Sequence, residues 1–166
     1  MKTKKNYFQG WYFKQSGKNT ICFIPSYHID NNGKISISLQ VITDLNSYYA
    51  QIKANKFYVL KKPLYININD NVFSRQGIKL NIAADNLKVQ ADLKFNKTIK
   101  PFKSIMGPFK YLPFMQCKHD CISLHHNVEG CCNINGQYYQ FDNGCGYIES
   151  DSGTSFPDMY IWSQYC

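Results

Sequence analysis

Hydrophobic and polar residues alternate along several stretches of the chain, as they do in strands that have one buried and one solvated face. In residues 87–95 every second side chain from Leu87 to Phe95 is apolar, and those between are lysine, glutamine or aspartate. The same alternation occurs in residues 35–41 and 78–82. The pattern predicts a half-buried β-strand in each of the three stretches.

Short runs rich in Asn, Asp and Gly separate these strands and predict turns. Asn135-Gly136 lies between two strand-like runs and predicts a type I′ hairpin. Further turns are predicted at residues 30–33, 70–71, 76–77, 85–86 and 142–144. The proline-bearing stretch 105–113 is predicted to be a long loop that forms a lid or crosses between sheets. No segment shows a convincing helical pattern.

The chain has 166 residues, enough for one domain with a hydrophobic core and too few for two comfortable ones. Its aromatic content of 16%, mostly Tyr and Phe, favours strands. We therefore predict a single β domain over residues 1–166. Its fold class is all-β, an antiparallel barrel or sandwich with little or no helix.

The net charge of +8 is unevenly placed along the chain. Residues 1–110 carry 18 Lys and Arg against 5 acids, whereas residues 111–166 carry only Lys118 against 6 acids. A basic surface can bind nucleic acid by releasing counterions. However, Arg75 is the only arginine, and base recognition relies on the arginine fork. We therefore expect no nucleic-acid partner and interpret the lysines as a solvated surface.

The amino terminus is basic, but no apolar stretch of signal-peptide length follows it. No window approaches the ~20 apolar residues that a membrane helix needs. We expect a cytoplasmic, soluble protein without a transmembrane segment.

Two aromatic clusters near the ends of the chain carry its most specific motifs. Each contains one of the two tryptophans, and between them three further motifs occur in order. The five segments are Phe8-Gln-Gly-Trp-Tyr-Phe-Lys14, Asp70-Asn-Val-Phe-Ser-Arg-Gln-Gly-Ile78, Ile105-Met-Gly-Pro-Phe-Lys-Tyr-Leu-Pro-Phe-Met-Gln-Cys-Lys-His119, Ser123-Leu-His-His126 and Gly144-Cys-Gly-Tyr-Ile-Glu-Ser-Asp-Ser-Gly-Thr-Ser-Phe-Pro-Asp-Met-Tyr-Ile-Trp-Ser-Gln164.

In this order, the five segments resemble the tocopherol cyclase family over nearly the whole range from Tyr7 to Gln164. The resemblance implies a lipocalin-like β fold that holds an apolar small molecule, such as a prenylated one. It also implies that the chain corresponds to the amino-terminal half of a family member. We therefore expect self-association or a complementary second half. The chain departs from the family pattern at Ser150, Ser152 and Thr154, where lysine, tryptophan and arginine are typical, and at Gln116 and Lys118.

The activity implied by the resemblance is the proton-initiated closure of a chromanol ring on a prenylated hydroquinone, an isomerisation that needs no cofactor. Such a site needs a protonated carboxylic acid and a group that accepts the phenol proton. Glu149 and Asp151 are the candidate acids, because side chains two apart on a strand share a face and close like charges raise one pKa. His119 and His126 are the candidate bases.

The predicted ligand-binding residues are aromatic and come from the two end clusters. They are Trp11, Tyr12, Phe13, Tyr147, Phe156 and Trp162.

Two alternatives to the enzyme remain open. In the first, the chain binds an apolar small molecule without catalysis, which requires only the aromatic wall. In the second, it is a decayed remnant that keeps the fold, and Glu149 and Asp151 anchor a turn near Gly153.

Cysteines suggest a metal site as a further alternative. The chain has seven cysteines, and Cys117, His119 and Cys121 alternate on one predicted strand face. Alternate residues on a strand lie ~6.8 Å apart, which strains chelation by neighbours, and no paired C-x₂-C motif is present. We therefore expect reduced structural cysteines and no metal.

Overall fold

The computed structural model describes residues 6–112 and 115–156, and these form one antiparallel sheet of eleven strands. A short 3₁₀ helix, η1 (Gly107–Tyr111), is the one helical element that these residues contain. The strands are β1 (Tyr7–Ser16), β2 (Thr20–Ile29), β3 (Ile35–Thr43), β4 (Ser47–Gln51), β5 (Phe57–Lys61), β6 (Leu64–Ile68), β7 (Asn71–Ser74), β8 (Gly77–Ala84), β9 (Leu87–Ile99), β10 (Cys117–Ile134) and β11 (Gln137–Gly153).

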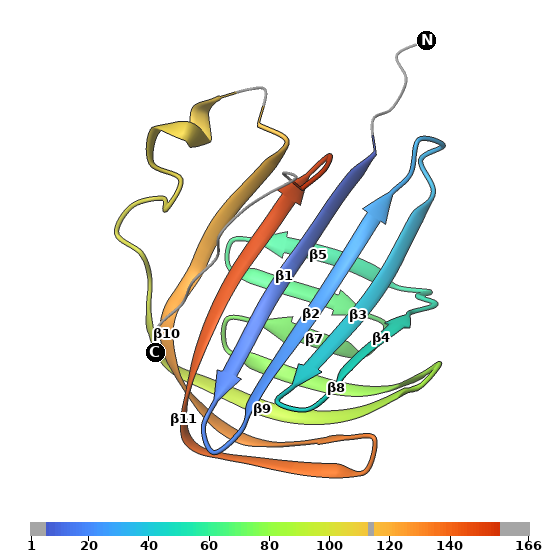
Figure 1. Cartoon of the computed structure of the whole chain (residues 1–166), viewed down its shortest axis with the longest axis vertical. Coiled ribbons are helices and arrows are strands. Elements are labelled where there is room, and N and C mark those ends of the chain that lie inside the picture. Colours follow the sequence, from blue (N-terminus) through green and yellow to red (C-terminus); the bar gives the residue numbers. More distant parts are fainter. Residues whose placement is uncertain (1–5, 113–114, 157–166) are drawn as a thin grey trace.

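The sheet consists of two meanders, β1–β4 and β5–β11, which join where β1 pairs with β11. The strand order is β4-β3-β2-β1-β11-β10-β9-β8-β7-β6-β5 (Figure 1). β4 and β5 therefore lie at opposite edges, yet only residues 52–56 connect them. Because a residue spans at most about 3.6 Å of extended chain, the sheet must curl until its edges approach each other. The result is a half-barrel, which confirms the predicted all-β, antiparallel class with little helix.

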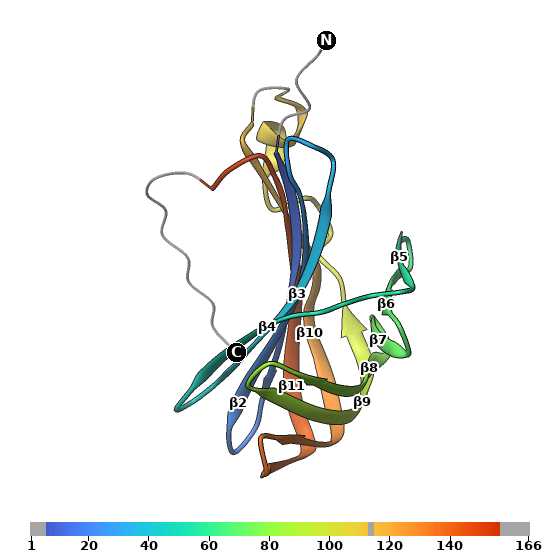
Figure 2. The ribbon, with the colours of Figure 1, turned by 90° about the vertical axis from the view of Figure 1, so that its right-hand side faces the viewer.

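The hydrophobic core fills the space between the two facing halves of the curled sheet. Figure 2 shows β5–β8 standing on one side of the layer formed by β1–β3, β10 and β11. Phe13 of β1 and Phe73 of β7 are fully buried, and their ring centroids lie 5.7 Å apart. The apolar positions of residues 78–82 and 87–95 are buried in this core, as the alternation predicts. In β3 the buried apolar positions are Leu39 and Val41, whereas Ile35 at its start is 54% exposed.

Most of the predicted turns occur where the Asn, Asp and Gly residues indicate them. Asn135 and Gly136, with φ of 50° and 90°, connect β10 to β11, which confirms the type I′ prediction. The turn predicted at 142–144 is wrong, because these residues lie inside β11. Asn143 has φ 58°, and the pairing register shifts between Val128 and Gly130, so this run forms a β-bulge that bends the strand.

The stretch 105–113 is a loop as predicted where the structure describes it, and it contains η1. The strand suggested by Met159–Trp162 lies outside the described residues. Within the described ranges, no helix is long and apolar enough to cross a membrane.

Replacing Phe13 by Ala removes a ring that joins the two halves of the core. We expect the free energy of unfolding to fall by about 3–5 kcal/mol, as for other buried Phe→Ala changes. The matched control is Leu45→Ala, because Leu45 is 81% exposed, and it should change stability by less than about 0.5 kcal/mol. Urea titrations would measure both. Equal effects of the two substitutions would contradict the described core.

Candidate functional site

An open groove of about 880 Å³ runs over β1, β2, β10 and β11. Most of its side chains project from the sheet face opposite to the hydrophobic core. Gly10 pairs with Asp151, Tyr12 with Glu149, and His119 with Asp151. Directly opposed residues of antiparallel strands point to the same face. Phe13 and Ile148, which pair with each other, point into the core. The groove is therefore on the outer face of the half-barrel and not inside it.

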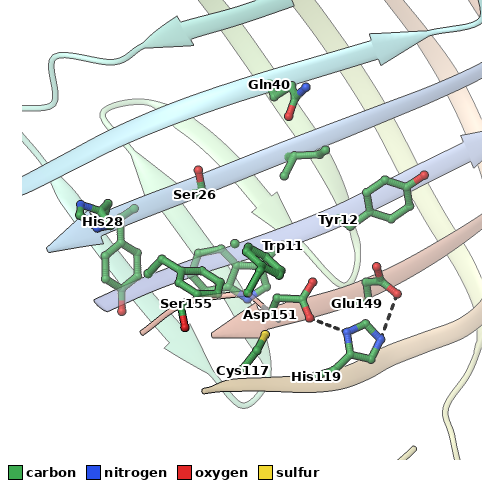
Figure 3. Close-up of a pocket in the computed structure, with 15 residues that line it drawn as sticks. Trp11, Tyr12, Ser26, His28, Gln40, Cys117, His119, Glu149, Asp151 and Ser155 are labelled. Atoms are coloured by element: carbon green, nitrogen blue, oxygen red, sulfur yellow. Dashed lines mark hydrogen bonds and ion pairs between the residues drawn. The ribbon is translucent and has the colours of Figure 1, made fainter. Parts of the chain in front are cut away.

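Apolar and aromatic groups form much of the groove wall. Tyr12 and Ile24 contribute from β1 and β2, and the rings of Phe8 and Phe156 stack with centroids 4.6 Å apart. Gly10 leaves the middle of the floor without a side chain. Figure 3 shows Tyr12, Glu149, Asp151 and His119 around this space. Such a wall can hold an apolar molecule beside a few polar groups.

The polar part of the groove is His119, which lies between two carboxylates. Its Nδ1 is 2.5 Å from Oδ1 of Asp151, and its Nε2 is 3.3 Å from Oε2 of Glu149 (Figure 3). The His119 and Asp151 side chains are about a quarter exposed, at 28% and 26%, whereas Glu149 is only 7% exposed. The hydroxyl of Tyr147 donates a hydrogen bond of 2.7 Å to the same Oε2. The fold thus places three of the four predicted catalytic residues together.

These contacts favour the protonated imidazolium. Hydrogen bonds to Asp151 and then to Glu149 raise the pKa of His119 to about 10, against the opposing effect of burial. Burial, reinforced by Glu149, raises the pKa of the Tyr147 hydroxyl well above its usual range. At neutral pH His119 is therefore an imidazolium, with hydrogen on both ring nitrogens. This arrangement does not favour His119 as the base, because both of its nitrogens already carry hydrogen.

The same geometry bears on metal binding. Ligand atoms of His119, Glu149 and Asp151 lie within 4.8 Å of one another, which is close enough to surround an ion. However, the two carboxylates contact different nitrogens of the same ring, on opposite sides of it. A single ion can bind only one of these nitrogens, so the cluster is built around the imidazolium. Cys117 borders the groove and Cys121 is buried, and burial raises the pKa of both thiols.

His126 lies apart from this cluster, on the core face of the sheet. It is fully buried and packs against Phe95, and its Nδ1 is 2.9 Å from Oγ of Ser123. Burial lowers its pKa to about 4, so this histidine is neutral. Its Nε2 and the side-chain atoms of Gln15 are buried without a partner among the described residues. Both residues pair with Gly146, which has no side chain to separate them.

The predicted ligand-binding residues divide between the two faces. Tyr12 and Phe156 line the groove, and Trp11, which is 2% exposed, borders it from the core side. Phe13 belongs to the core, and Tyr147 is buried beside Glu149. Trp162 lies outside the described residues.

The sequence-based prediction missed several groove residues, among them Phe8, Gly10 and Ile24. The two-residue period of a strand places Phe8 and Gly10 on the same face as Tyr12. That signal becomes usable only once the strand register is known, because the period alone does not show which face carries the groove.

Known proteins give little further information about the chain. No model of a known protein family matches it, and no curated protein matches it. Among solved structures, a crystal structure of a candidate AttH protein from Nitrosomonas europaea is similar over 93% of this chain, with 12% sequence identity and a TM-score of 0.39. The chain spans about half of that protein, 52% of its length. The resemblance to the tocopherol cyclase family therefore rests on the sequence motifs alone.

The raised pKa of His119 predicts how stability depends on pH. Its pKa is higher in the folded state than the 6.5 of a free histidine, so its contribution is complete below about pH 6.5 and is lost as the pH rises toward 10. We expect the ring-carbon NMR signals of His119 to remain those of an imidazolium at pH 8. In the Asp151→Asn variant the titration midpoint should fall by at least one unit. A wild-type midpoint near 6.5 would contradict the described cluster.

The tight packing of His126 on Gly146 gives a second prediction. A Cβ added at Gly146 would overlap Nε2 of His126. Gly146→Ala should therefore lower the free energy of unfolding by about 1–3 kcal/mol. In a His126→Ala background, where the clashing ring is absent, the same Gly146→Ala substitution should be nearly neutral. Additive effects in this double-mutant cycle would be inconsistent with the described contact.

Proposed function

We propose that the chain binds an apolar, ring-bearing small molecule in the outer groove and cyclises it by proton transfer. The observation that carries the proposal is the His119 cluster, with its two carboxylates, set into an apolar wall. The motifs shared with the tocopherol cyclase family support a prenylated hydroquinone as the substrate. The product is then a chromanol, and no cofactor is consumed.

The proposed chemistry begins with transfer of a proton from the cluster to the less substituted carbon of the trisubstituted alkene. A C–H bond forms and the other alkene carbon becomes a tertiary cation. The phenol oxygen attacks this carbon, a C–O bond forms, and the O–H proton returns to the cluster. Atoms and charge therefore balance without an external reagent. Aromatic faces of the wall, including Tyr12 and Phe8, stabilise the cation by their negative π faces.

Within the cluster, the carboxylate of Asp151 is partly exposed and lines the groove, where it can reach a ligand. The proton that the cluster carries is on His119, and Asp151 receives it from Nδ1 of His119 through their hydrogen bond before delivering it to the alkene. Glu149 is buried and accepts hydrogen bonds from Tyr147 and His119, so it fixes the ring from the other side. We assign Asp151 as the residue that delivers the proton, His119 as the residue that supplies it, and Glu149 as the residue that positions the imidazolium.

Filling the groove should weaken ligand binding without unfolding the protein. A Cβ at Gly10 would meet only Cβ of Ser26, at 3.6 Å, which is an ordinary contact. We expect Gly10→Leu to reduce the affinity for a prenylated hydroquinone at least tenfold in calorimetric titrations, with the unfolding midpoint nearly unchanged. Gly10→Ala, which adds one methyl group, is the matched control and should bind within about threefold of wild type. Undiminished binding to Gly10→Leu would rule out the groove as the site.

Catalysis is tested separately from binding. Asp151→Asn removes the carboxylate that passes the proton from His119 to the ligand, and we expect turnover of the prenylated hydroquinone to fall by about 10²–10⁴-fold, the usual contribution of general acid catalysis. Ligand affinity should remain within a few fold of wild type. Chromanol formation followed by chromatography measures the first quantity, and calorimetry the second. Wild-type protein that binds the ligand but forms no chromanol would support the non-catalytic binder, for which the apolar wall alone suffices.

A further inference from the structure

A second, smaller pocket of about 400 Å³ lies on the core side of the sheet, behind the His119 cluster. Alternation along β10 and β11 creates it. Glu149 and Asp151 point to the groove and His119 borders both cavities, whereas Lys118 and Ser150, their neighbours in sequence, point the other way. Apart from His119, the proposed cyclisation uses none of the residues that line this pocket, so its ligand is a separate question.

Four lysines from three separate segments surround this second pocket, which we call the lysine pocket. Lys61 ends β5 and Lys62 follows it, Lys110 belongs to η1 and Lys118 to β10. Asp120 is the one carboxylate among the residues that line it. Among the described residues, none of the four ammonium groups forms an ion pair, and Lys110 instead lies 4.7 Å from the ring centroid of Tyr111. Like charges gathered around one concavity produce a positive potential that attracts an anion.

Neutral hydrogen-bonding groups and apolar side chains complete the lining. The hydroxyl-bearing residues Ser104, Ser150 and Ser152 lie among the lysines, and such groups can donate hydrogen bonds to an anion. Leu64, Met106 and Ile122 form an apolar part. Phosphate oxygens suit lysines, which act as point charges, and serines. The apolar part adds room for a short hydrocarbon portion.

We propose that the lysine pocket binds the phosphate group of a small phosphorylated molecule whose body is apolar. The concave shape and limited volume favour a single phosphate-bearing group over a nucleic acid, whose backbone needs an extended basic stripe. The ligand enters from the side of the β5–β6 connection and η1, where Lys61, Lys62 and Lys110 are exposed.

Butyl phosphate tests the proposal, because it carries one phosphate and a short apolar chain. We expect saturable, sub-millimolar binding in calorimetric titrations, weaker binding of inorganic phosphate, and loss of affinity as salt rises. The variant with both Lys61→Gln and Lys62→Gln should bind at least tenfold more weakly. Lys62→Gln combined with Lys118→Gln tests the same site from another strand.

The matched control has the same change in net charge elsewhere. Lys79 and Lys88 are exposed on β8 and β9 and do not line the pocket. Replacing both by Gln should leave the affinity within twofold of wild type. Equal losses in the pocket and control variants would overturn the proposal in favour of diffuse surface charge. Binding only to phosphatidic acid vesicles, or only to an oligonucleotide, with none to butyl phosphate, would also overturn it.

Discussion

The ion-paired imidazolium of His119 is the interaction around which the outer face of the sheet is organised. It connects β10 to two positions of β11, and through the pairing of Tyr12 with Glu149 and Gly10 with Asp151 it is linked to β1. The backbone N–H of His119 also contacts Sδ of Met106, at 3.2 Å, so the loop between β9 and β10 is anchored at the same point. One buried and one partly exposed carboxylate therefore meet a single cation at the junction of the two meanders.

This arrangement gives the two sheet faces different physical roles. The core face holds the aliphatic and aromatic side chains that keep the curled halves together, and the histidine buried there, His126, remains neutral. The outer face carries the charged His119 cluster, which is partly exposed, and the apolar wall of the groove. A ligand in the groove would thus approach Asp151 without disturbing the core, which permits chemistry without a loss of stability. The lysine pocket uses the remaining alternate positions of the same strands.

Much of the fold follows from the sequence because its signals are local. The two-residue period predicts the strands in residues 78–82 and 87–95, and Asn135-Gly136 predicts a hairpin. The run at 142–144 has turn chemistry but forms a bulge, because β10 and β11 continue to pair on both sides of it. Local composition cannot distinguish a hairpin turn from a bulge within a continuing strand.

The candidate site follows from the sequence only in part. The proximity of Glu149, Asp151 and His119 combines a local rule, the shared face of alternate residues, with a register that only the assembled sheet defines. The separation of His126 from them depends on bulges between Cys121 and His126 that no sequence pattern reveals. An NMR chemical-shift map of the labelled protein during titration with a prenylated hydroquinone would locate the ligand. We expect the largest shifts at Gly10, Tyr12, Ile24 and His119, because the ligand binds the outer groove and not the interior of the half-barrel. Large shifts among core residues such as Phe73 and Ile148, with the groove residues unaffected, would contradict this placement.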